Sequence, residues 1–584
     1  MVKSEYKILQ AVQICAVLSN DYKKEYGVSK AGKLFWYSCR CQTESAFEQC
    51  PTESSCGLVC VKRNSSGGRM EEIMFSSVLS AAIYGVEAVQ VRVEADVSDG
   101  LPCFAMVGYV SSQVKEAQDR VRTALRNTNL ALPPKRITIN LAPADLRKDG
   151  SWFDLPVAAA VLGAIGKIPR NSMENTMVAG ELGLNGAIQS VSGILPMVLK
   201  AKEIGCTKCI IPKGNENEGN VVAGIQIIAV DSLSQFIAFC NMKEPLAAEA
   251  ESQTDLGISQ DDYDVDFADV HGQEAVKRAA LIAAAGFHNL LMIGPPGTGK
   301  TMIAKRISTI LPLMAKQEQL EVTRIYSVAG LLPEGAALLT RRPFRAPHHT
   351  ISPQALAGGG RVPQPGEVTL AHRGVLFLDE LPEMGKRSME VLRQPLEERE
   401  ITVSRLYGTA RFPATTMLVG AMNPCACGYY PDLNKCCCTP TSLNSYAGKI
   451  SQPLLDRLDL CVEVPAISYK DLQENKESPM GSRQMRQAVE KALDIQKERY
   501  RSLDICFNSE ITGANLNEFC VLDVGAQKLL ERIFDKMGLS ARAYHRILKT
   551  ARTIADLAGS EVIQEEHLSE AVCYRSPDKN FWRI

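Results

Sequence analysis

Eight consecutive residues have the composition and spacing of a loop that binds nucleotide phosphates: Gly294-Pro295-Pro296-Gly297-Thr298-Gly299-Lys300-Thr301. Glycines let backbone N–H groups turn towards phosphate oxygens, and the helix expected after the loop adds the positive end of its dipole. We expect the Lys300 ammonium to contact the β- and γ-phosphates and the Thr301 hydroxyl to bind Mg²⁺. The loop therefore predicts a site for a magnesium–nucleotide complex.

Two further apolar runs end in polar side chains suited to hydrolysing that nucleotide. Residues 374–378 lead into Asp379-Glu380, where Asp379 would hold Mg²⁺ and Glu380 would polarise the attacking water. Residues 416–422 lead into Asn423, which would orient the same water beside the γ-phosphate. An acid directly after Asp379 favours hydrolysis over binding alone. The sequence thus predicts an ATPase that uses ATP and Mg²⁺.

Two arginines further along the chain are candidates to complete the site. Arg457 would reach the γ-phosphate of a neighbouring subunit as a finger that neutralises charge in the transition state. An ordinary salt bridge is the alternative for a single arginine. Arg542, at the start of a C-terminal helix, would reach the nucleotide as a sensor, and Arg546 competes with it for that role.

A group of cysteines follows Asn423, and its spacing suits a metal. Cys425 and Cys427, with Cys436 and Cys438, form a C-x-C…C-x-C pattern. Four thiolates are a closed ligand set for structural Zn²⁺. Reduced thiols without metal are the open alternative, and the additional Cys437 leaves the choice of ligands ambiguous.

The elements that must position these residues alternate between strands and helices, as expected of an α/β nucleotide-binding fold. A strand over 289–293 should enter the phosphate loop, and a helix should follow from Met302. Before this core, residues 111–127 predict an amphipathic helix, 136–141 a strand and 154–165 a buried helix. The predicted divisions are an N-terminal extension over 1–73, an α+β domain over 74–245, a linker over 246–265, the ATPase core over 266–475 and a helical region over 476–584.

Length and charge limit the class of protein. The 584 residues suggest about three or four domains. The formal net charge of −1 gives no general basic field for nucleic acid, although one domain can still present a basic surface. No run approaches the ~18 apolar residues of a membrane-spanning helix, and no convincing secretory signal is present. We therefore expect a cytoplasmic protein without a membrane partner.

Residues 1–73 differ from the rest of the chain. They hold six of the 19 cysteines, have no clear period and end near the flexible run 64–68. Two interpretations stay open. In the first, the extension is disordered, or is upstream sequence translated from an early start codon, and does not belong to the folded protein. In the second, it is a small metal-binding module.

Several stretches outside these motifs resemble one family of ATPases. They are Ile-Thr-Ile-Asn-Leu-Ala-Pro-Ala-Asp-Leu-Arg over 137–147, Phe-Asp-Leu-Pro over 153–156, Arg-Pro-Phe-Arg-Ala-Pro-His-His over 342–349 and Met-Asn-Pro-Cys over 422–425. From about Met74 to Arg575 the chain is similar to the YifB/ComM family of magnesium-chelatase-like AAA+ ATPases. The resemblance implies an N-terminal α+β domain like ribosomal S5 domain 2, as in Lon proteases. It also implies an AAA+ core with helix-2 and pre-sensor insertions, and a C-terminal helical lid.

The resemblance also implies partners and an activity. Such ATPases assemble as homohexameric rings, and the ComM branch is a DNA helicase that promotes branch migration during natural transformation. We therefore expect a motor acting on single-stranded or branched DNA. A hairpin predicted over 401–412 would place Arg405 and Arg411 on DNA phosphates, and an ordinary solvated hairpin is the open alternative. The second basic candidate is the group Arg341, Arg342 and Arg345, whereas His348 and His349 are expected to be structural.

Other functions stay open beside the DNA motor. One is a magnesium-chelatase subunit or a protein-remodelling chaperone, although the α+β domain argues against a simple chelatase subunit. A Lon-type protease would need a Ser–Lys dyad, and Ser192 and Lys200 lack a recognisable context for one. An inactive scaffold is disfavoured because all the main catalytic positions are filled.

Overall fold

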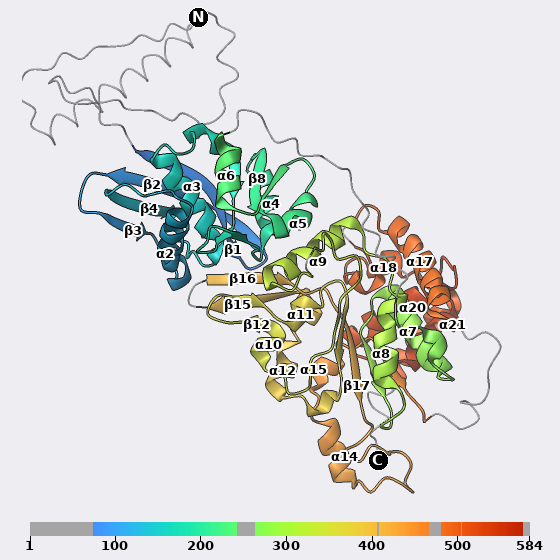
Figure 1. Cartoon of the computed structure of the whole chain (residues 1–584). Coiled ribbons are helices and arrows are strands. Elements are labelled where there is room, and N and C mark those ends of the chain that lie inside the picture. The colour runs from blue at the N-terminus through green and yellow to red at the C-terminus, as the bar shows by residue number, and fades with distance from the viewer. Residues whose placement is uncertain are drawn as a thin grey trace, which may run out of the picture. The chain divides into compact units, whose positions relative to one another are not determined.

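The computed structural model describes residues 74–241, 263–466 and 480–575, apart from positions 334, 406, 407 and 504. The extension 1–73 and most of the linker 246–265 lie outside the described residues, so both interpretations of the extension remain predictions. Figure 1 shows the N-terminal domain in blue and blue-green, and the core and C-terminal helices from green to red. No helix within the described ranges is long and apolar enough to cross a membrane.

The N-terminal domain is built on a seven-stranded sheet with the order β3-β4-β2-β1-β5-β8-β9. β2 pairs antiparallel with both β1 and β4. The other pairs are parallel: β3 with β4, β1 with β5, β5 with β8, and β8 with β9. The strands are β1 (Phe75–Tyr84), β2 (Glu87–Ser98), β3 (Cys103–Val107), β4 (Arg136–Ala142), β5 (Thr176–Val178), β8 (Lys208–Pro212) and β9 (Gln226–Val230), with a separate pair β6 (Glu181–Leu182) and β7 (Ile188–Gln189).

The helices of this domain follow the sequence patterns. α2 (Ser112–Asn127) begins after Ser111, whose hydroxyl accepts the N–H of Val114 at 3.3 Å. α3 (Asp154–Ala164) is buried along its whole length, as its run of small apolar residues predicts, and it packs on β1 and β2. The remaining helices are α4 (Ile194–Glu203), α5 (Glu216–Asn220) and α6 (Leu233–Asn241). The predicted α+β organisation is therefore present.

The core contains a five-stranded parallel sheet with the order β11-β14-β17-β10-β18. Its strands are β10 (Leu290–Ile293), β11 (Phe344–Arg345), β14 (Val375–Leu378), β17 (Met417–Met422) and β18 (Leu460–Glu463). Side chains alternate between its two faces. Leu290 and Met292 pack with α7 (Glu274–Gly286), α8 (Lys300–Ile310) and the C-terminal helices, whereas Leu291 and Ile293 pack with the inserted segments. Both faces are covered, as is usual for a parallel sheet.

The inserted segments lie between α8 and β11, between β11 and β17, and beyond β17. They include the hairpin β15 (Glu400–Arg405) and β16 (Gly408–Pro413), whose antiparallel register confirms the predicted hairpin. The other elements are α9 (Lys316–Ala329), α10 (Pro353–Ala357), β12 (Gly358–Gly359), β13 (Gln364–Pro365), α11 (Glu367–Leu370), α12 (Lys386–Val391), α13 (Pro395–Glu398), α14 (Pro440–Ala447) and α15 (Gln452–Leu455), with the 3-10 helix η6 (Leu381–Glu383).

The C-terminal region is helical, as predicted. Its helices are α17 (Ser482–Arg499), α18 (Leu516–Phe519), α19 (Val524–Met537), α20 (Ala541–Leu557) and α21 (Glu565–Cys573). α17 and α20 pack on α7 and share its hydrophobic core (Figure 1). The buried carboxylate of Asp556 accepts hydrogen bonds from Arg499, Arg552 and Asn508, which tie α17 to α20.

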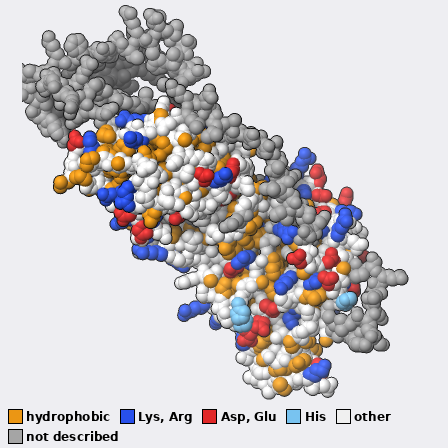
Figure 2. Space-filling model, viewed as in Figure 1, with side chains coloured by type: hydrophobic (Ala, Val, Ile, Leu, Met, Phe, Trp, Pro, Cys, Tyr) orange, Lys and Arg blue, Asp and Glu red, His pale blue; other side chains and the backbone are white. Residues whose placement is uncertain are grey.

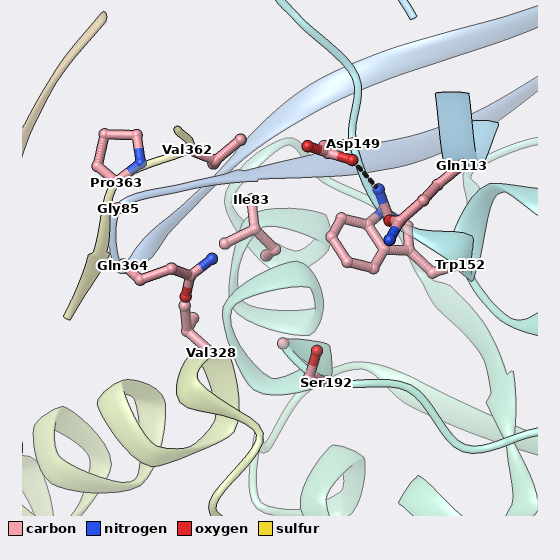
Figure 3. A pocket seen from close by; sticks show the side chains of 12 residues that line it. Ile83, Gly85, Gln113, Asp149, Trp152, Ser192, Val328, Val362, Pro363 and Gln364 are labelled. Atoms are coloured by element: carbon pink, nitrogen blue, oxygen red, sulfur yellow. Dashed lines mark hydrogen bonds between the residues drawn. The ribbon is translucent and has the colours of Figure 1, made fainter. Parts of the chain in front are cut away.

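The N-terminal domain contacts the core at the end of α9. Glu218 is buried there and accepts hydrogen bonds from the Ser327 hydroxyl at 2.5 Å and from the Leu195 N–H at 2.8 Å. A cavity of about 280 Å³ lies nearby, with Trp152 and Ile83 as its apolar walls and Asp149 at its rim (Figure 3). None of the predicted nucleotide-binding residues lines this cavity.

Candidate functional site

The phosphate loop joins β10 to α8 at the carboxyl edge of the sheet. Gly297 and Gly299 have φ angles of 78° and 86°, and a Cβ added to either would meet no atom within 4 Å. Glycine adopts this left-handed region without strain, and the open space beside it is where a ligand can approach the backbone. Because Gly299 turns the chain, α8 begins at Lys300 rather than at the predicted Met302. Lys300 and Thr301 therefore lie in its first turn.

Lys300 connects the loop to the predicted sensor Asn423. Its ammonium donates hydrogen bonds to the carbonyls of Gly294 and Pro295, at 2.7 and 2.8 Å, and to Asn423 Oδ1 at 3.2 Å. Burial lowers the pKa of Lys300, and the negative charges of Asp379 and Glu380 oppose that shift. The structure thus brings together residues that are far apart in the sequence.

Asp379 follows β14 and lies against the loop. Its Oδ2 accepts a hydrogen bond from the Thr301 hydroxyl at 2.7 Å, and its Oδ1 accepts the N–H of Glu380 at 2.9 Å. A hydroxyl and a carboxylate oxygen side by side are the hard oxygen donors that Mg²⁺ prefers. These two residues therefore fit the predicted role in holding the ion.

Glu380 has a partner that the sequence did not indicate. Its Oε2 lies 3.0 Å from Nδ1 of His349, a residue expected to be only structural. His349 follows β11, which neighbours β14 in the sheet. The two residues meet because β11 and β14 are adjacent in the sheet, and the sequence did not indicate this strand order.

Arg457 and Arg542 lie together at the other edge of the sheet. Arg457 is buried and pairs with Glu397, and the other oxygen of Glu397 accepts from Arg542 at 3.1 Å. The Asn289 side chain, just before β10, donates to the Arg457 carbonyl, which places this group at the amino ends of the parallel strands. Arg542 therefore lies away from this chain's own phosphate loop, which is at the carboxyl ends of the strands, and its role as a sensor stays a prediction.

The two arginines line a cavity of about 410 Å³. Arg546, the competitor for the sensor role, also lines it and pairs with Asp459 at 2.5 Å. Basic side chains outnumber acidic ones around it: Arg399, Arg457, Arg542, Arg546 and Lys549 against Glu397, Asp459 and Glu510. Such a pocket is suited to an anion supplied from outside the chain.

The four predicted cysteine ligands converge. The sulfur atoms of Cys425, Cys427, Cys436 and Cys438 all lie within 4.8 Å of one another, whereas Cys437 is exposed and outside the group. Three of the S···S distances are 3.3, 3.5 and 3.8 Å. A tetrahedron with Zn–S bonds of about 2.3 Å has edges of about 3.8 Å, so the donor set fits zinc.

The cysteine segment also packs on the phosphate loop. A Cβ added to Gly428 would lie 2.7 Å from Cδ of Pro296. Cys425 follows Asn423 by two residues and is buried. The cluster therefore lies beside both the loop and the predicted sensor.

In the second basic candidate, Arg342 and Arg345 have partners within the core, whereas Arg341 is exposed. Arg342 is buried and donates to the carbonyls of Pro312 and Arg373 and to Glu318. Arg345 makes two hydrogen bonds to Glu367, at 2.7 and 2.8 Å. The Arg342 guanidinium therefore holds the core together, and the half-buried Arg345 guanidinium is engaged by Glu367.

The hairpin also presents basic residues at the surface. Arg405 and Arg411 are exposed on β15 and β16, whereas Ile401, Val403, Ala410 and Phe412 are buried. The buried side of the hairpin meets the turn between β1 and β2, where Gly85 lies against Ala410. Its polar side therefore remains free for contact.

The Ser–Lys pair considered for a protease has other surroundings. The Lys200 ammonium pairs with Glu203 at 2.8 Å, one helical turn further along α4. Ser192 lines the cavity beside Trp152. The structure gives no support to a catalytic dyad at these two residues.

Three family models match the chain. The one described as magnesium chelatase, subunit ChlI, matches residues 266–472. The one described as subunit ChlI of Mg-chelatase matches residues 93–215, and the one for the C-terminal part of this subunit matches residues 479–575. The matches thus extend over the α+β domain, the core and the C-terminal helices.

Similar proteins are found in several bacteria. The competence protein ComM of Haemophilus influenzae is 42% identical over 503 residues, which cover 85% of this chain and 97% of ComM. The uncharacterized protein YifB of Escherichia coli is 42% identical over 505 residues, which cover 86% of this chain and 97% of YifB. Lon protease 2 of Bacillus subtilis is 33% identical over 128 residues, 22% of each chain. Because ComM and YifB match along almost their whole length, the chain belongs to the YifB/ComM family of magnesium-chelatase-like AAA+ proteins.

Proposed function

We propose that this protein is an ATP-hydrolysing ring motor that acts on DNA. The observation that carries the ATPase proposal is the contact of Lys300 with Asn423 and of Thr301 with Asp379 around one open loop. These pairs bring a phosphate-binding cation, a magnesium-binding pair and a water-orienting amide to the same edge of the sheet. Glu380 adds the carboxylate that hydrolysis needs.

Each residue has a defined task in this proposal. The Lys300 ammonium moves from the carbonyls of Gly294 and Pro295 to the β- and γ-phosphates when ATP binds. Thr301 and Asp379 hold Mg²⁺, which neutralises phosphate charge when it is bound. Asn423 orients the attacking water, and Glu380 polarises it and accepts its proton.

The arginine pocket supports a site shared between subunits. Arg457 and Arg542 lie at the opposite edge of the sheet from the loop, so each would act on ATP held by a neighbour. AAA+ proteins often form rings, and the family resemblance favours a homohexamer. We infer that the anion for which this pocket is suited is the γ-phosphate of the adjacent subunit.

We propose further that the domain over 74–245 has the S5 domain 2-like fold of Lon proteases, and that residues 476–584 act as a lid over the core. The first proposal rests on the family resemblance and on the mixed sheet with helices that this domain contains. The packing of α17 and α20 against α7 supports the second, because α7 directly precedes the strand that enters the loop. Movement of these helices would then follow the nucleotide state.

DNA is proposed as the polymer on which the motor acts. The relative ComM is named a competence protein, and the β15–β16 hairpin has two exposed arginines, Arg405 at the tip of β15 and Arg411 on β16. On the face shown in Figure 2, basic and acidic side chains are otherwise interspersed. We infer branch migration in the cytoplasm, in recombination or natural transformation, as the process served.

Replacing Arg405 and Arg411 together with Ala is expected to weaken binding to single-stranded DNA. Loss of two phosphate contacts should also lower the slope of log affinity against log salt by about 1 to 2. Fluorescence anisotropy over a salt series measures both effects. The matched control is Arg393→Ala, which removes an arginine paired with Glu390 on α12. Equal affinity and slope for the double variant and the control would remove the hairpin from the proposed DNA interface.

A magnesium-chelatase-like or protein-remodelling ATPase is the alternative. It is favoured by the chelatase family models, which match the core and the C-terminal helices. ATP turnover that responds to a porphyrin-metallating complex or to an unfolded protein, and not to DNA, would support it.

We propose a structural zinc site at Cys425, Cys427, Cys436 and Cys438. Cys427→Ser is expected to lose the metal, because three thiolates no longer close the tetrahedron. Cys437→Ser is the matched control and should keep about one zinc per chain, because Cys437 lies outside the group. Elemental analysis of the purified variants gives the readout. Zinc-free wild type, or equal zinc in both variants, contradicts the site.

A further inference from the structure

The carboxylate of Glu397 engages both arginines that the proposed shared site needs. Its Oε2 pairs with Nη2 of Arg457, and its Oε1 accepts a hydrogen bond from Nη2 of Arg542 at 3.1 Å. The Arg457 side chain is buried, whereas half of the Glu397 side chain is exposed. In the single chain, the two arginines therefore hold an anion of their own subunit.

The Arg457 guanidinium is only partly satisfied by these contacts. Its Nη1 donates to the Pro453 carbonyl at 2.6 Å, and its Nη2 pairs with Glu397. Its Nε is buried and has no hydrogen-bond partner within the described part of the chain. Nε and Nη2 form the edge of a guanidinium that binds two oxygens of a carboxylate or a phosphate at once. Glu397 uses half of this edge, so a further oxygen can bind to the other half.

Two hydroxyl groups in the same cavity are in a similar condition. Thr416 Oγ1 and Ser509 Oγ are buried, line the cavity beside Arg457 and have no partner among the residues that the structure describes. A buried polar atom without a partner destabilises the fold, and such atoms mark places where a ligand completes the hydrogen bonds. A phosphoryl group presents three oxygens, whereas a carboxylate presents two. The donors around this cavity therefore exceed what the Glu397 carboxylate can satisfy.

We propose that Glu397 is a positioning residue that holds Arg457 and Arg542 in the single chain, and that a phosphate oxyanion displaces its carboxylate. In the ring, this oxyanion is the γ-phosphate of the neighbouring subunit's ATP, so the proposal rests on the shared site proposed above. The exchange keeps a negative charge beside the buried guanidinium, which is destabilising when it is left without one.

Exposure decides which partner moves in this exchange. The carboxylate of Glu397 is half exposed and can enter water when it leaves, and ion pairs with an exposed partner are weak. Its helix, α13, is only four residues long. Arg457 is held in place by Pro453 and by Asn289, whose side-chain amide donates to the Arg457 carbonyl at 3.0 Å. The carboxylate therefore leaves, and the buried guanidinium stays.

The first experiment measures the binding of inorganic phosphate to the full chain without nucleotide, by calorimetry. A Lys300→Ala background weakens the phosphate loop as a competing site. Glu397→Gln keeps the size of the side chain and removes the competing charge, so it should bind phosphate at least about threefold more tightly. Adding Arg542→Ala, at the exposed arginine of the pair, should reduce this gain, and adding Arg457→Ala should remove it.

Glu398→Gln is the matched control for the phosphate measurement. Glu398 is the next residue on α13 and is exposed, but its carboxylate accepts a hydrogen bond from Gln394 at 2.7 Å and contributes nothing to the lining of the cavity. Its phosphate affinity should equal that of the Lys300→Ala parent. The comparison thus separates the loss of one carboxylate beside the arginines from a general change in surface charge.

The second experiment follows ring assembly of the full chain with Lys300 intact, by sedimentation, with ADP or with a non-hydrolysable ATP analogue. Without the competing carboxylate, the γ-phosphate of a neighbour engages the arginines more readily. Glu397→Gln should therefore lower the protein concentration of half-assembly at least about threefold with the analogue and leave it unchanged with ADP. A merely structural role of Glu397 would not depend on the γ-phosphate.

The outcomes separate this proposal from the function on which it rests. Phosphate binding that is no tighter in Glu397→Gln than in Glu398→Gln, or a gain that survives Arg457→Ala, overturns the displacement of Glu397. An equal shift of assembly with ADP and with the analogue overturns it as well. Wild-type protein that neither assembles with the analogue nor hydrolyses ATP contradicts the shared ATPase site, and with it the exchange in the ring, whatever the phosphate affinity of Glu397→Gln.

Discussion

Replacement of Glu380 with Gln is expected to lower ATP turnover by about 10²-fold or more while ATP binding persists. Glutamine keeps the size of the side chain but cannot accept the proton of the attacking water, which raises the barrier by ~2.7 kcal/mol or more. The residues that would hold ATP, Lys300, Thr301 and Asp379, are left unchanged. Turnover is measured by phosphate release, and binding by the fluorescence of a labelled ATP analogue.

The control for this variant is Glu383→Gln. Glu383 ends the short 3-10 helix that begins directly after Glu380, and its carboxylate pairs with Lys449 at 2.8 Å. Its turnover should remain close to that of the wild type. A Glu380→Gln protein that hydrolyses ATP at the wild-type rate would show that another group activates the water.

Arg457→Ala is expected to abolish turnover in a ring of identical subunits and to be rescued by mixing. A finger of this kind contributes about 10³- to 10⁵-fold to turnover. An Arg457→Ala subunit keeps its own phosphate loop, and a Glu380→Gln subunit keeps its own arginine. Rings assembled from both therefore contain some sites with every group in place, and the mixture should hydrolyse ATP although neither variant does so alone. Phosphate release from the mixed and unmixed proteins gives the comparison.

The mixing experiment distinguishes action on a neighbour's ATP from action on the subunit's own. If Arg457 acted within its own chain, every site of the mixed ring would lack one group, and no activity would return. Arg542→Ala should behave like Arg457→Ala in the mixture, because both residues share Glu397. Arg393→Ala, away from this pocket, should need no rescue.

Local elements of the fold could be predicted from the sequence, because they depend on short-range patterns. The buried α3, the amphipathic α2 and the β15–β16 hairpin all appear where the patterns indicate. The start of α8 was misplaced by two residues, because the left-handed Gly299 ends the loop before Lys300. Boundaries of this kind depend on backbone angles that hydropathy does not encode.

The sequence predicts which site residues lie together where those residues directly follow parallel strands. Lys300, Asp379 and Asn423 each follow a strand, and parallel strands bring such residues to one edge. Arg542 comes from a helix in the C-terminal region, whose position depends on packing with α7 and α17. Its placement at the amino edge therefore needed the structure.

The contact of His349 and the choice of ligands among the cysteines also depend on the arrangement of the folded chain. His349 meets Glu380 because β11 pairs with β14, a strand order that the sequence does not state. Cys437 is excluded from the sulfur group because the backbone of this loop points its neighbours, Cys436 and Cys438, to the same side. The burial of Arg342 likewise depends on distant carbonyl groups.

The proposed DNA-dependent ATPase is tested by the rate of ATP hydrolysis of the assembled wild-type protein, measured with and without single-stranded and four-way DNA. A shared ATPase site linked to the arginines of the hairpin predicts turnover without DNA and a clear increase when DNA is added. Hydrolysis that does not respond to DNA, in a protein that also fails to bind it, would contradict the DNA motor. The absence of any hydrolysis by an assembled ring would contradict the ATPase itself.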